Sequence, residues 1–275
     1  MSKNNQMVSI ITAAFNASKY VSETIESVLR QEYTNWELIV VDNNSNDNTL
    51  QIVKSFADKR IIGISEYKQG VGHARNAGLK IMKGSFFCFL DADDVMPPTA
   101  LSSRLQIFES NPNLDFVDGR VQYVDEVLVP INKKYTPSFI GMPFDRLLKL
   151  DSSCLFGNTW MIKKDPTENY TFQTDMTHAE DLFFYLSISR GKQYSFTSDT
   201  VLLYRQREGS AMSDIRGLEN GYIKLIKKIK IRLNTPFKTL FLLKLKIAKI
   251  MCLSFLFHDR NFVAAIKSPI RILKA

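Results

Sequence analysis

Short apolar runs alternate with segments of helical periodicity through the first hundred residues. The apolar runs predict four β-strands, at 8–13, 36–41, 60–65 and 86–90. Apolar side chains at helical spacing predict three helices between them, at 19–31, 49–56 and 73–82. A regular alternation of strands and helices is typical of a doubly wound parallel α/β sheet.

Beyond residue 100 the rhythm changes. The pattern predicts further elements: a helix at 101–110, a strand pair within 115–129, helices near 144–150 and 181–189, and a strand at 194–204. This part has the mixed order of an α+β arrangement, and no internal repeat or low-complexity linker precedes residue 216. We therefore expect one body at 1–215, with halves 1–100 and 101–215, followed by a tail at 216–275.

Three carboxylates follow the fourth strand directly, in the sequence Asp91-Ala92-Asp93-Asp94. Open α/β sheets bind their ligands at the carboxyl ends of the strands. Neighbouring carboxylates repel one another unless they share a positive charge, and a hard divalent cation bound with substrate phosphates supplies one. The alternative is a solvated turn in which Asp94 caps the helix introduced by the two following prolines. The acids alone leave both interpretations open.

Polar or aromatic residues also follow the first two strands. Phe15 and Asn16 come after the first strand, and Asp42 ends the second. Because the carboxyl ends of parallel strands meet at one edge of a sheet, we expect these residues and the acids to converge there.

Composition narrows the class of protein. With 275 residues, 45% of them hydrophobic, the chain can bury a large core. The three cysteines and three histidines are scattered, which argues against a zinc site and indicates buried thiols at Cys88 and Cys252 in a reducing compartment. The polar opening leads straight into a strand, so we expect no secretory signal and a cytoplasmic location.

Four ordered motifs carry a specific resemblance. They read VSIITAAFN at 8–16, LIVVDNNSNDNT at 38–49, ARNAG at 74–78 and FLDADD at 89–94, and Glu180-Asp181 and Tyr204-Arg205 follow them. Together they closely resemble the family 2 glycosyltransferases, including those of bacterial capsule, O-antigen and exopolysaccharide synthesis. The resemblance implies a GT-A fold, in which a Rossmann-like nucleotide-sugar-binding sheet flanked by helices (1–100) joins a mixed acceptor-side half (101–215). It also implies a metal-dependent, inverting hexosyltransferase.

The resemblance places the donor nucleotide at the first two strands. Asp42 matches the acid that accepts a hydrogen bond from the nucleobase, usually uracil, and an acceptor-only side chain suits an imide N–H. Thr12 and Phe15 match residues that line the base pocket, beside Asn16, although core packing explains Phe15 equally well. Arg75 follows a glycine-containing loop at a helix start, which suits contacts to the nucleotide or its diphosphate.

The same resemblance assigns the acids. Asp91 matches the ribose contact and Asp93 the ligand of Mn²⁺ or Mg²⁺, whose charge stabilises the leaving nucleoside diphosphate. Asp94 matches a residue that supports the turn. Asp181 matches the general base that takes the proton of the acceptor hydroxyl.

For several other residues that match the family, the chemistry of the residue alone allows a structural role as well. Glu180 and Asp181 could also be acids favoured by a helix N-terminus. His178 could contact the acceptor or leaving group, or be an ordinary loop residue, and Arg205 belongs to the last matching motif. Asp47 matches a structural acid for which an Asx-turn is a sufficient role.

Two departures from the family pattern concern the donor base. The first strand ends in Ala13-Ala14-Phe15-Asn16 without the frequent proline, and the second loop lacks a second aspartate and a glycine after Asp42. Uridine remains the expected base. Gly70 and Gly72 do not complete a nicotinamide fingerprint, because Arg75 stands where the third glycine belongs.

The tail carries most of the net charge of +8. Between Glu219 and Asp259 there are nine lysines and arginines and no acid, within two predicted helices at 222–233 and 236–257. A spanning helix needs about 20 largely uncharged residues, which the lysines prevent. Apolar bulk with interleaved lysines favours a helix in an anionic membrane interface, and a hairpin packed on the body with a solvated lysine face is the alternative. Nothing resembling a nucleic-acid-reading module accompanies the charge.

We therefore expect a glycosyltransferase that uses a nucleotide sugar, UDP by preference, and a lipid-linked saccharide acceptor at the cytoplasmic face of a bacterial membrane. Capsule or lipopolysaccharide assembly is the expected setting. Processive synthesis is not expected, because no Gln-x-x-Arg-Trp sequence occurs. The rival hypotheses are a sugar-nucleotide pyrophosphorylase, disfavoured by a first loop without glycine, and a non-catalytic membrane-associated sugar-binding protein.

Overall fold

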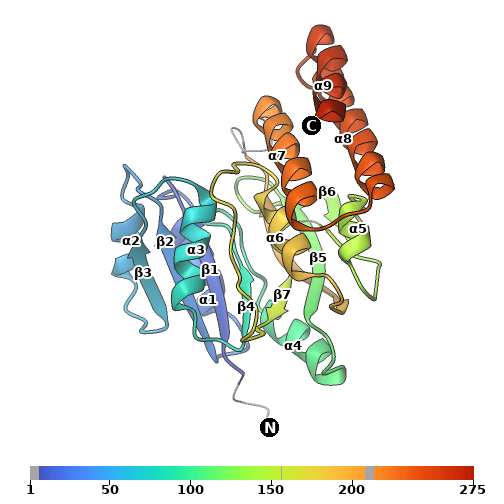
Figure 1. Ribbon diagram of the computed structural model, residues 1–275. Helices are drawn as coiled ribbons and strands as arrows, with labels where there is room; N and C mark the ends of the chain where they lie inside the picture. Colours follow the sequence, from blue (N-terminus) through green and yellow to red (C-terminus); the bar gives the residue numbers. More distant parts are fainter. Residues whose placement is uncertain (1–5, 156, 208–213) are drawn as a thin grey trace.

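The computed structural model describes residues 6–155, 157–207 and 214–275, and the predicted strand–helix alternation is present in its first hundred residues (Figure 1). The elements of this half are β1 (Val8–Ala14), α1 (Val21–Leu29), β2 (Trp36–Asp42), α2 (Thr49–Ser55), β3 (Ile61–Ser65), α3 (Val71–Ile81) and β4 (Phe86–Phe89). β1 pairs in parallel with β2 and β4, and β2 pairs in parallel with β3. The predicted doubly wound parallel arrangement is therefore correct for this half.

The second half extends the same sheet with mixed strands. Its elements are α4 (Ala100–Ser110), β5 (Phe116–Val124), β6 (Pro130–Tyr135), α5 (Phe144–Leu148), β7 (Met161–Lys163), α6 (Glu180–Ile188) and β8 (Tyr194–Arg205). The strand order is β3-β2-β1-β4-β7-β5-β6, and β8 pairs in parallel with β5. β7 joins the halves, since it is antiparallel to both β4 and β5.

The prediction from the sequence places one of these strands wrongly and omits another. The expected partner of β5 within 115–129 is wrong, because β6 begins at Pro130, after a turn held by Asp125. β7 is three residues long, which is too short to show a period.

Helices cover both faces of the sheet, which gives two apolar cores. Ile10 of β1 faces the core under α1 and α4, and the next residue, Ile11, faces the core under α3 and α6. Of the two thiols expected inside, Cys88 is buried but Cys252 is only half-buried. Because the β1–β4 strands are covered on both sides, their carboxyl ends are where polar side chains can meet a ligand.

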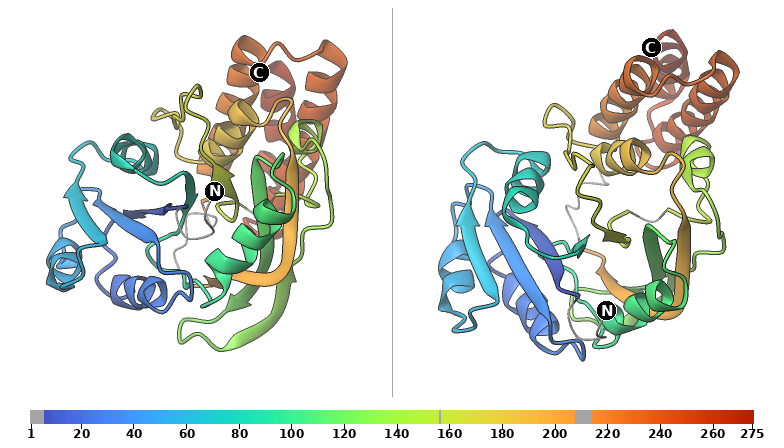
Figure 2. Two further views of the ribbon diagram at one scale, coloured as in Figure 1. Left: turned by 90° about the horizontal axis from the view of Figure 1, so that it is seen from below. Right: turned by 60° about the horizontal axis from the view of Figure 1, so that its bottom comes forward.

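The tail forms three helices that project from the second half (Figures 1 and 2). They are α7 (Ile215–Arg232), α8 (Phe237–Phe257) and α9 (Phe262–Lys274). α8 and α9 pack together as a hairpin, and their inner residues join the core beneath α6 and α7. α9 was not predicted; Asn261 caps it by accepting from the Ala264 N–H at 3.0 Å. Among the described residues, no helix has the length and apolarity needed to cross a bilayer.

Candidate active site

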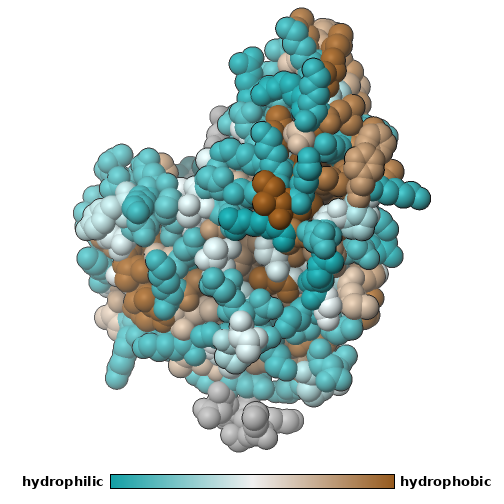
Figure 3. Space-filling view, viewed as in Figure 1, coloured by the Kyte–Doolittle hydropathy of each residue, from teal (hydrophilic) through white to brown (hydrophobic). Residues whose placement is uncertain are grey.

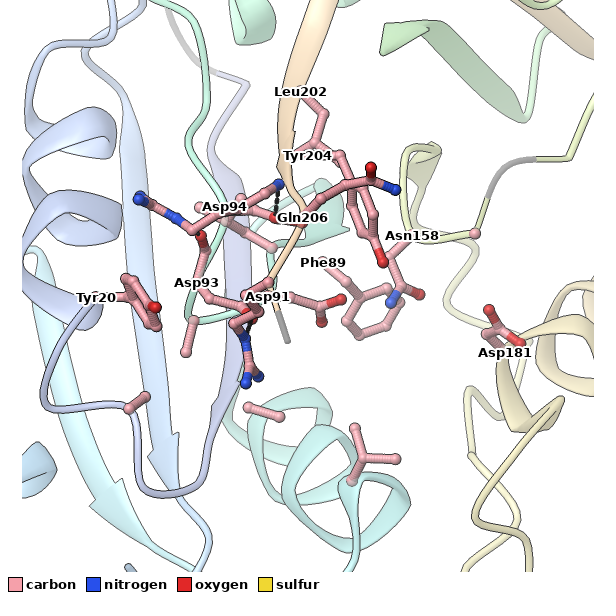
Figure 4. A pocket seen from close by; sticks show the side chains of 18 of the residues that line it. Tyr20, Phe89, Asp91, Asp93, Asp94, Asn158, Asp181, Leu202, Tyr204 and Gln206 are labelled. Atoms are coloured by element: carbon pink, nitrogen blue, oxygen red, sulfur yellow. Dashed lines mark hydrogen bonds and ion pairs between the residues drawn. The ribbon is translucent and has the colours of Figure 1, made fainter. Parts of the chain in front are cut away.

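A cavity of about 1180 Å³ lies where the carboxyl ends of β1 and β4 meet β8 and the start of α6 (Figure 4). Most of the predicted site residues line it, although they come from segments far apart in the sequence. These are Phe15, Asn16, Arg75, Asp91, Asp93, Asp94, His178, Glu180, Asp181 and Arg205. The expected convergence of the strand ends is thus present.

Two predicted donor residues, Thr12 and Asp42, do not line this cavity; both are buried in their strands. Asp42 lies opposite Ala14 in the β1–β2 pair, and its Oδ2 accepts from the Ser45 N–H at 3.4 Å. Its buried Oδ1 has no hydrogen-bond partner among the described residues. An orphaned carboxylate oxygen is costly unless a ligand donates to it, so Asp42 is still suited to a nucleobase.

Phe15 is half exposed, with 51% of its surface accessible, so the core-packing interpretation of this residue is wrong. The neighbouring Asn16 adopts a positive φ of 48° and binds the loop after β2: its side chain accepts from the Asn46 N–H at 2.9 Å. Asp47 forms the expected Asx-turn with the Thr49 N–H and also accepts from the Ser18 N–H. These contacts hold the loops after β1 and β2 together beside the cavity.

Residues 91–94, which we call the acid turn, have a contact from a different arginine at each carboxylate. Asp91 pairs with Arg75 at 3.0 Å, and Asp93 pairs with Arg207 at 2.5 Å. Asp94 is buried and accepts from the Arg205 backbone N–H at 2.9 Å. The solvated-turn alternative is therefore wrong: Asp94 supports the turn and does not cap α4.

Arg75 joins the two sides of the cavity. It is buried in α3, where it donates to Asp91 at 3.0 Å and to Glu180, at the start of α6, at 3.1 Å. Its guanidinium lies over the Phe172 ring, 5.2 Å from the centroid. Arg75 therefore links β4 to α6, and its predicted contact with the donor diphosphate stays a prediction.

Asp181 lies in the first turn of α6, across the cavity from the acid turn (Figure 4). Its Oδ1 accepts from the Leu182 N–H at 2.6 Å, and a Cβ at Gly157 would lie 3.6 Å from its Oδ2. Burial raises the pKa of Asp181 above its ordinary value, and the positive charge of Arg75 opposes that rise. Burial likewise raises the pKa of Glu180, the nearby Asp181 charge adds to the rise, and Arg75 again opposes it.

His178 and Arg205 both line the cavity but make structural contacts. His178 packs on α7, where a Cβ at Gly217 or Gly221 would lie within 2.5 or 2.6 Å of it. Arg205 is buried and ties β8 to the acid turn, donating from Nε to the Asp93 carbonyl at 2.7 Å. It also pairs with Glu23 of α1 at 2.5 Å.

The sequence patterns did not single out several residues that line the cavity, among them Tyr20, Asn158, Gln206 and Arg207 (Figure 4 labels the first three). Arg207 is the most consequential omission because it pairs with Asp93. The signal that could have found it is its place two residues after Arg205, on the same side of an extended chain.

The carboxylate oxygens of the acid turn are suitable ligands for a hard cation. No group of three or more His, Cys, Asp or Glu side chains that could hold a metal occurs within the described residues. Asp91 and Asp93 nevertheless present carboxylate oxygens at the cavity wall, with 40% and 23% of their side-chain surfaces exposed. Mg²⁺ at phosphate-binding sites commonly takes only one or two protein carboxylates, with the substrate phosphates completing its shell.

Comparison with known proteins agrees with this geometry. Residues 9–171 match the family model described as glycosyl transferase family 2. The chain is 42% identical over 212 residues to WfaP of Escherichia coli, a UDP-Glc:alpha-D-GlcNAc-diphosphoundecaprenol beta-1,3-glucosyltransferase, and the match covers 76% of this chain and 81% of that protein.

Solved structures share the fold. The crystal structure of S. aureus TarS 1-349 with UDP-GlcNAc aligns with a TM-score of 0.68 at 20% identity, over 97% of this chain and 81% of that one. The mannosyltransferase PcManGT of Pyrobaculum calidifontis, in complex with GDP-Man and Mn²⁺, aligns with a TM-score of 0.63 at 16% identity, over 95% of this chain and 73% of that one. The predicted GT-A-like fold is confirmed, and the chain belongs to glycosyl transferase family 2 and is a glycosyltransferase.

Proposed function

We propose that this glycosyltransferase moves a hexose from a UDP-sugar to a hydroxyl of a lipid-linked saccharide in bacterial surface polysaccharide synthesis, with inversion at the anomeric carbon. The observation that carries the proposal is the opposition of the acid turn and Asp181 across one cavity. In an inverting transfer the nucleoside diphosphate leaves from one side of the anomeric carbon and the acceptor hydroxyl attacks from the other. The groups that assist these two events must therefore lie on opposite sides of the transferred sugar.

The choice of UDP rests on Asp42 and on a relative. The unpartnered Oδ1 of Asp42 is an acceptor for the imide N–H of uracil. WfaP, which shares 42% of its aligned residues with this chain, is named for UDP-Glc and for an acceptor linked to diphosphoundecaprenol. Glucose and a GlcNAc-diphosphate lipid are therefore the first donor sugar and acceptor to test.

In the proposed mechanism Asp181 accepts the proton of the acceptor hydroxyl as that oxygen attacks the anomeric carbon. The bond from that carbon to the diphosphate breaks in the same step, and the released UDP keeps the electron pair. Asp93, with Asp91 beside it, would hold Mn²⁺ or Mg²⁺, which supplies Lewis-acid stabilisation of the charge on the diphosphate. Arg75 holds Asp91 and Glu180 in place.

The pKa of Asp181 predicts a pH dependence. Asp181 must be deprotonated to act as a base, and burial raises its pKa. Transfer should therefore fall off as pH decreases, with an acidic limb above the ordinary aspartate pKa of about 3.9. The measurement is kcat against pH at saturating donor and acceptor, in the range where the protein stays folded by circular dichroism. A rate that stays constant down to the ordinary aspartate pKa would contradict the assignment.

The deciding experiment combines the protein with UDP-glucose, Mn²⁺ and a synthetic GlcNAc-diphosphate lipid, and reads the products by mass spectrometry. A hexosylated lipid with release of UDP supports the proposal. Formation of pyrophosphate from the donor would instead indicate a pyrophosphorylase. If a saturation-transfer NMR screen finds nucleotide-sugar binding but this donor and acceptor do not react, the proposed substrate pair is wrong.

A membrane-facing tail fits a lipid-linked acceptor. From residue 220 to the end there are thirteen lysines and arginines and one acid. α8 packs against the body, as the second hypothesis expected, yet the hairpin also leaves large apolar side chains exposed along its outer edge (Figure 3). These include Phe237, Phe241, Leu245, Phe257, Phe262, Val263, Ile266 and Ile270. Apolar side chains beside an excess of positive charge suit an anionic bilayer surface.

Replacing three exposed residues of α9, by F262S, I266S and I270S together, is expected to weaken binding to anionic vesicles at least tenfold. Each side chain loses part of the roughly 1.5–3 kcal/mol that full burial of an apolar side chain contributes. Co-sedimentation with phosphatidylglycerol vesicles measures the effect. Y67S, which removes an exposed aromatic residue from the first half of the body, away from the tail, is the control. Equal sedimentation of the triple variant and wild type would refute the membrane-facing tail.

A further inference from the structure

Among the residues that the structure describes, the cavity contains one arginine that the fold does not bury. Three arginines of the described ranges line it, and the exposed fractions of their side chains are 5% for Arg75, 1% for Arg205 and 38% for Arg207. Arg75 and Arg205 are bound to carboxylates and carbonyls of the surrounding elements. Arg207 is therefore the arginine whose guanidinium can reach a ligand.

The end of β8 determines where Arg207 lies. Leu203 and Val95 exchange both backbone hydrogen bonds, at 2.8 and 3.2 Å, so β8 is fixed to the segment just after the acid turn. Arg205 adds the hydrogen bonds to the acid turn described above. Two residues further on, Arg207 meets Asp93, with Nε 2.5 Å from Oδ2. This ion pair places a positive charge at the carboxylate that would hold the divalent cation.

A guanidinium and a divalent cation cannot both bind the same small carboxylate at full strength. A guanidinium also forms charge-assisted hydrogen bonds with phosphate oxygens, and its five N–H donors allow it to exchange one anion for the other. A donor diphosphate bound beside Asp93 would lie within reach of Arg207.

We propose that Arg207 is an exchangeable counter-ion: it neutralises Asp93 in the donor-free protein and binds the donor diphosphate when Asp93 takes up the cation. This rests on the proposed function and adds to it a residue that stabilises the leaving UDP. The exchange keeps the acid turn neutralised in the donor-free protein and directs Arg207 to the leaving group once the donor is bound.

Exchange predicts an effect of R207Q that depends on the metal. With saturating Mn²⁺ the pair with Asp93 is already broken, so loss of Arg207 removes the full phosphate contact and UDP binding should weaken on the order of tenfold. In EDTA, wild-type Arg207 must leave Asp93 to reach UDP. The free energy gained from the new contact with UDP is then offset by the free energy lost from the contact with Asp93. There R207Q should bind UDP within about threefold of wild type. Isothermal titration calorimetry with UDP measures both.

Two further variants define the comparison. R207K keeps a positive charge, so its affinity with Mn²⁺ should lie between those of wild type and R207Q. R30Q removes an exposed arginine at the C-terminal end of α1, where it pairs with Glu26, and should bind UDP as wild type does in both media.

An equal loss of affinity in EDTA and in Mn²⁺ would mean that Arg207 is a fixed phosphate contact, and this would overturn the exchange. Unchanged affinity in both media would overturn it as well. If wild type binds no UDP in either medium, the proposed function itself has failed. If wild type binds UDP and only R207Q departs from the expected pattern, the proposed function survives without the exchange.

Discussion

Asp181→Asn is expected to reduce sugar transfer by roughly 10²- to 10⁴-fold, the usual contribution of a general base. Asparagine preserves the size of the side chain and its hydrogen bond from the Leu182 N–H, so α6 should still begin at the same place. It cannot accept the proton of the acceptor hydroxyl. Because Asp181 lies across the cavity from the acid turn, the affinity for UDP should be unchanged. Single-turnover transfer and calorimetry of UDP binding measure the two quantities.

The control for this substitution is Asp175→Asn, on the loop that leads to α6. Asp175 is an exposed carboxylate that pairs with Lys228 at 2.9 Å, and its loss changes the net charge by the same amount. It should leave transfer within a factor of two of wild type. Wild-type turnover by D181N would remove Asp181 as the base, and a matching loss in D175N would point to a general effect of charge.

The first half of the fold was predictable because its information is local. Each strand from β1 to β4 is an apolar run of its own, and residues of distinctive chemistry follow β1 and β4 and end β2. Parallel pairing then brings Phe15 and the acid turn to one edge of the sheet, and this is where the cavity lies. Asp181 was predicted as a site residue only from the resemblance to the family motifs, because no local pattern connects it to that edge of the sheet.

The rest depends on contacts between segments distant in the sequence. β7 has three residues and becomes a strand because β4 and β5 pair with its two edges. The partner of Asp93 lies 114 residues further along the chain, and one of the two partners of Arg75, Glu180, lies 105 residues away. α9 has the apolar spacing of a helix, but Pro269 within it obscured the pattern. Such pairings are decided by the packed structure, so residue spacing cannot reveal them.

The Arg75 ion pairs both position the residues of the site and contribute to the stability of the fold. The guanidinium is buried between two carboxylates that differ in exposure: the side chain of Asp91 is 40% exposed and that of Glu180 is 10% exposed. Asp91 can regain water if Arg75 is lost. Glu180 would be left as an uncompensated buried charge, beside Asp181.

Arg75→Met is therefore expected to destabilise the protein by roughly 3–5 kcal/mol, the usual cost of removing one partner from a buried ion pair. For a chain of this length, the melting temperature should fall by roughly 10 °C. Methionine loses the cation–π contact of the guanidinium with the Phe172 ring, but its thioether can still pack against that ring, so the change is mainly the loss of charge and hydrogen bonds. Thermal unfolding followed by circular dichroism at neutral pH measures the effect.

The origin of this cost can be isolated with a second substitution. In the double variant R75M/E180Q, the buried carboxylate is removed together with its partner, so much of the lost stability should return. E180Q alone leaves Arg75 paired with Asp91 and should cost less than R75M. If the double variant is as unstable as the sum of the two single variants, the loss comes from the packing of Arg75 and not from the charge it leaves behind. Recovery of stability without recovery of transfer would show that Arg75 also orients α6, and with it Asp181, toward the acid turn.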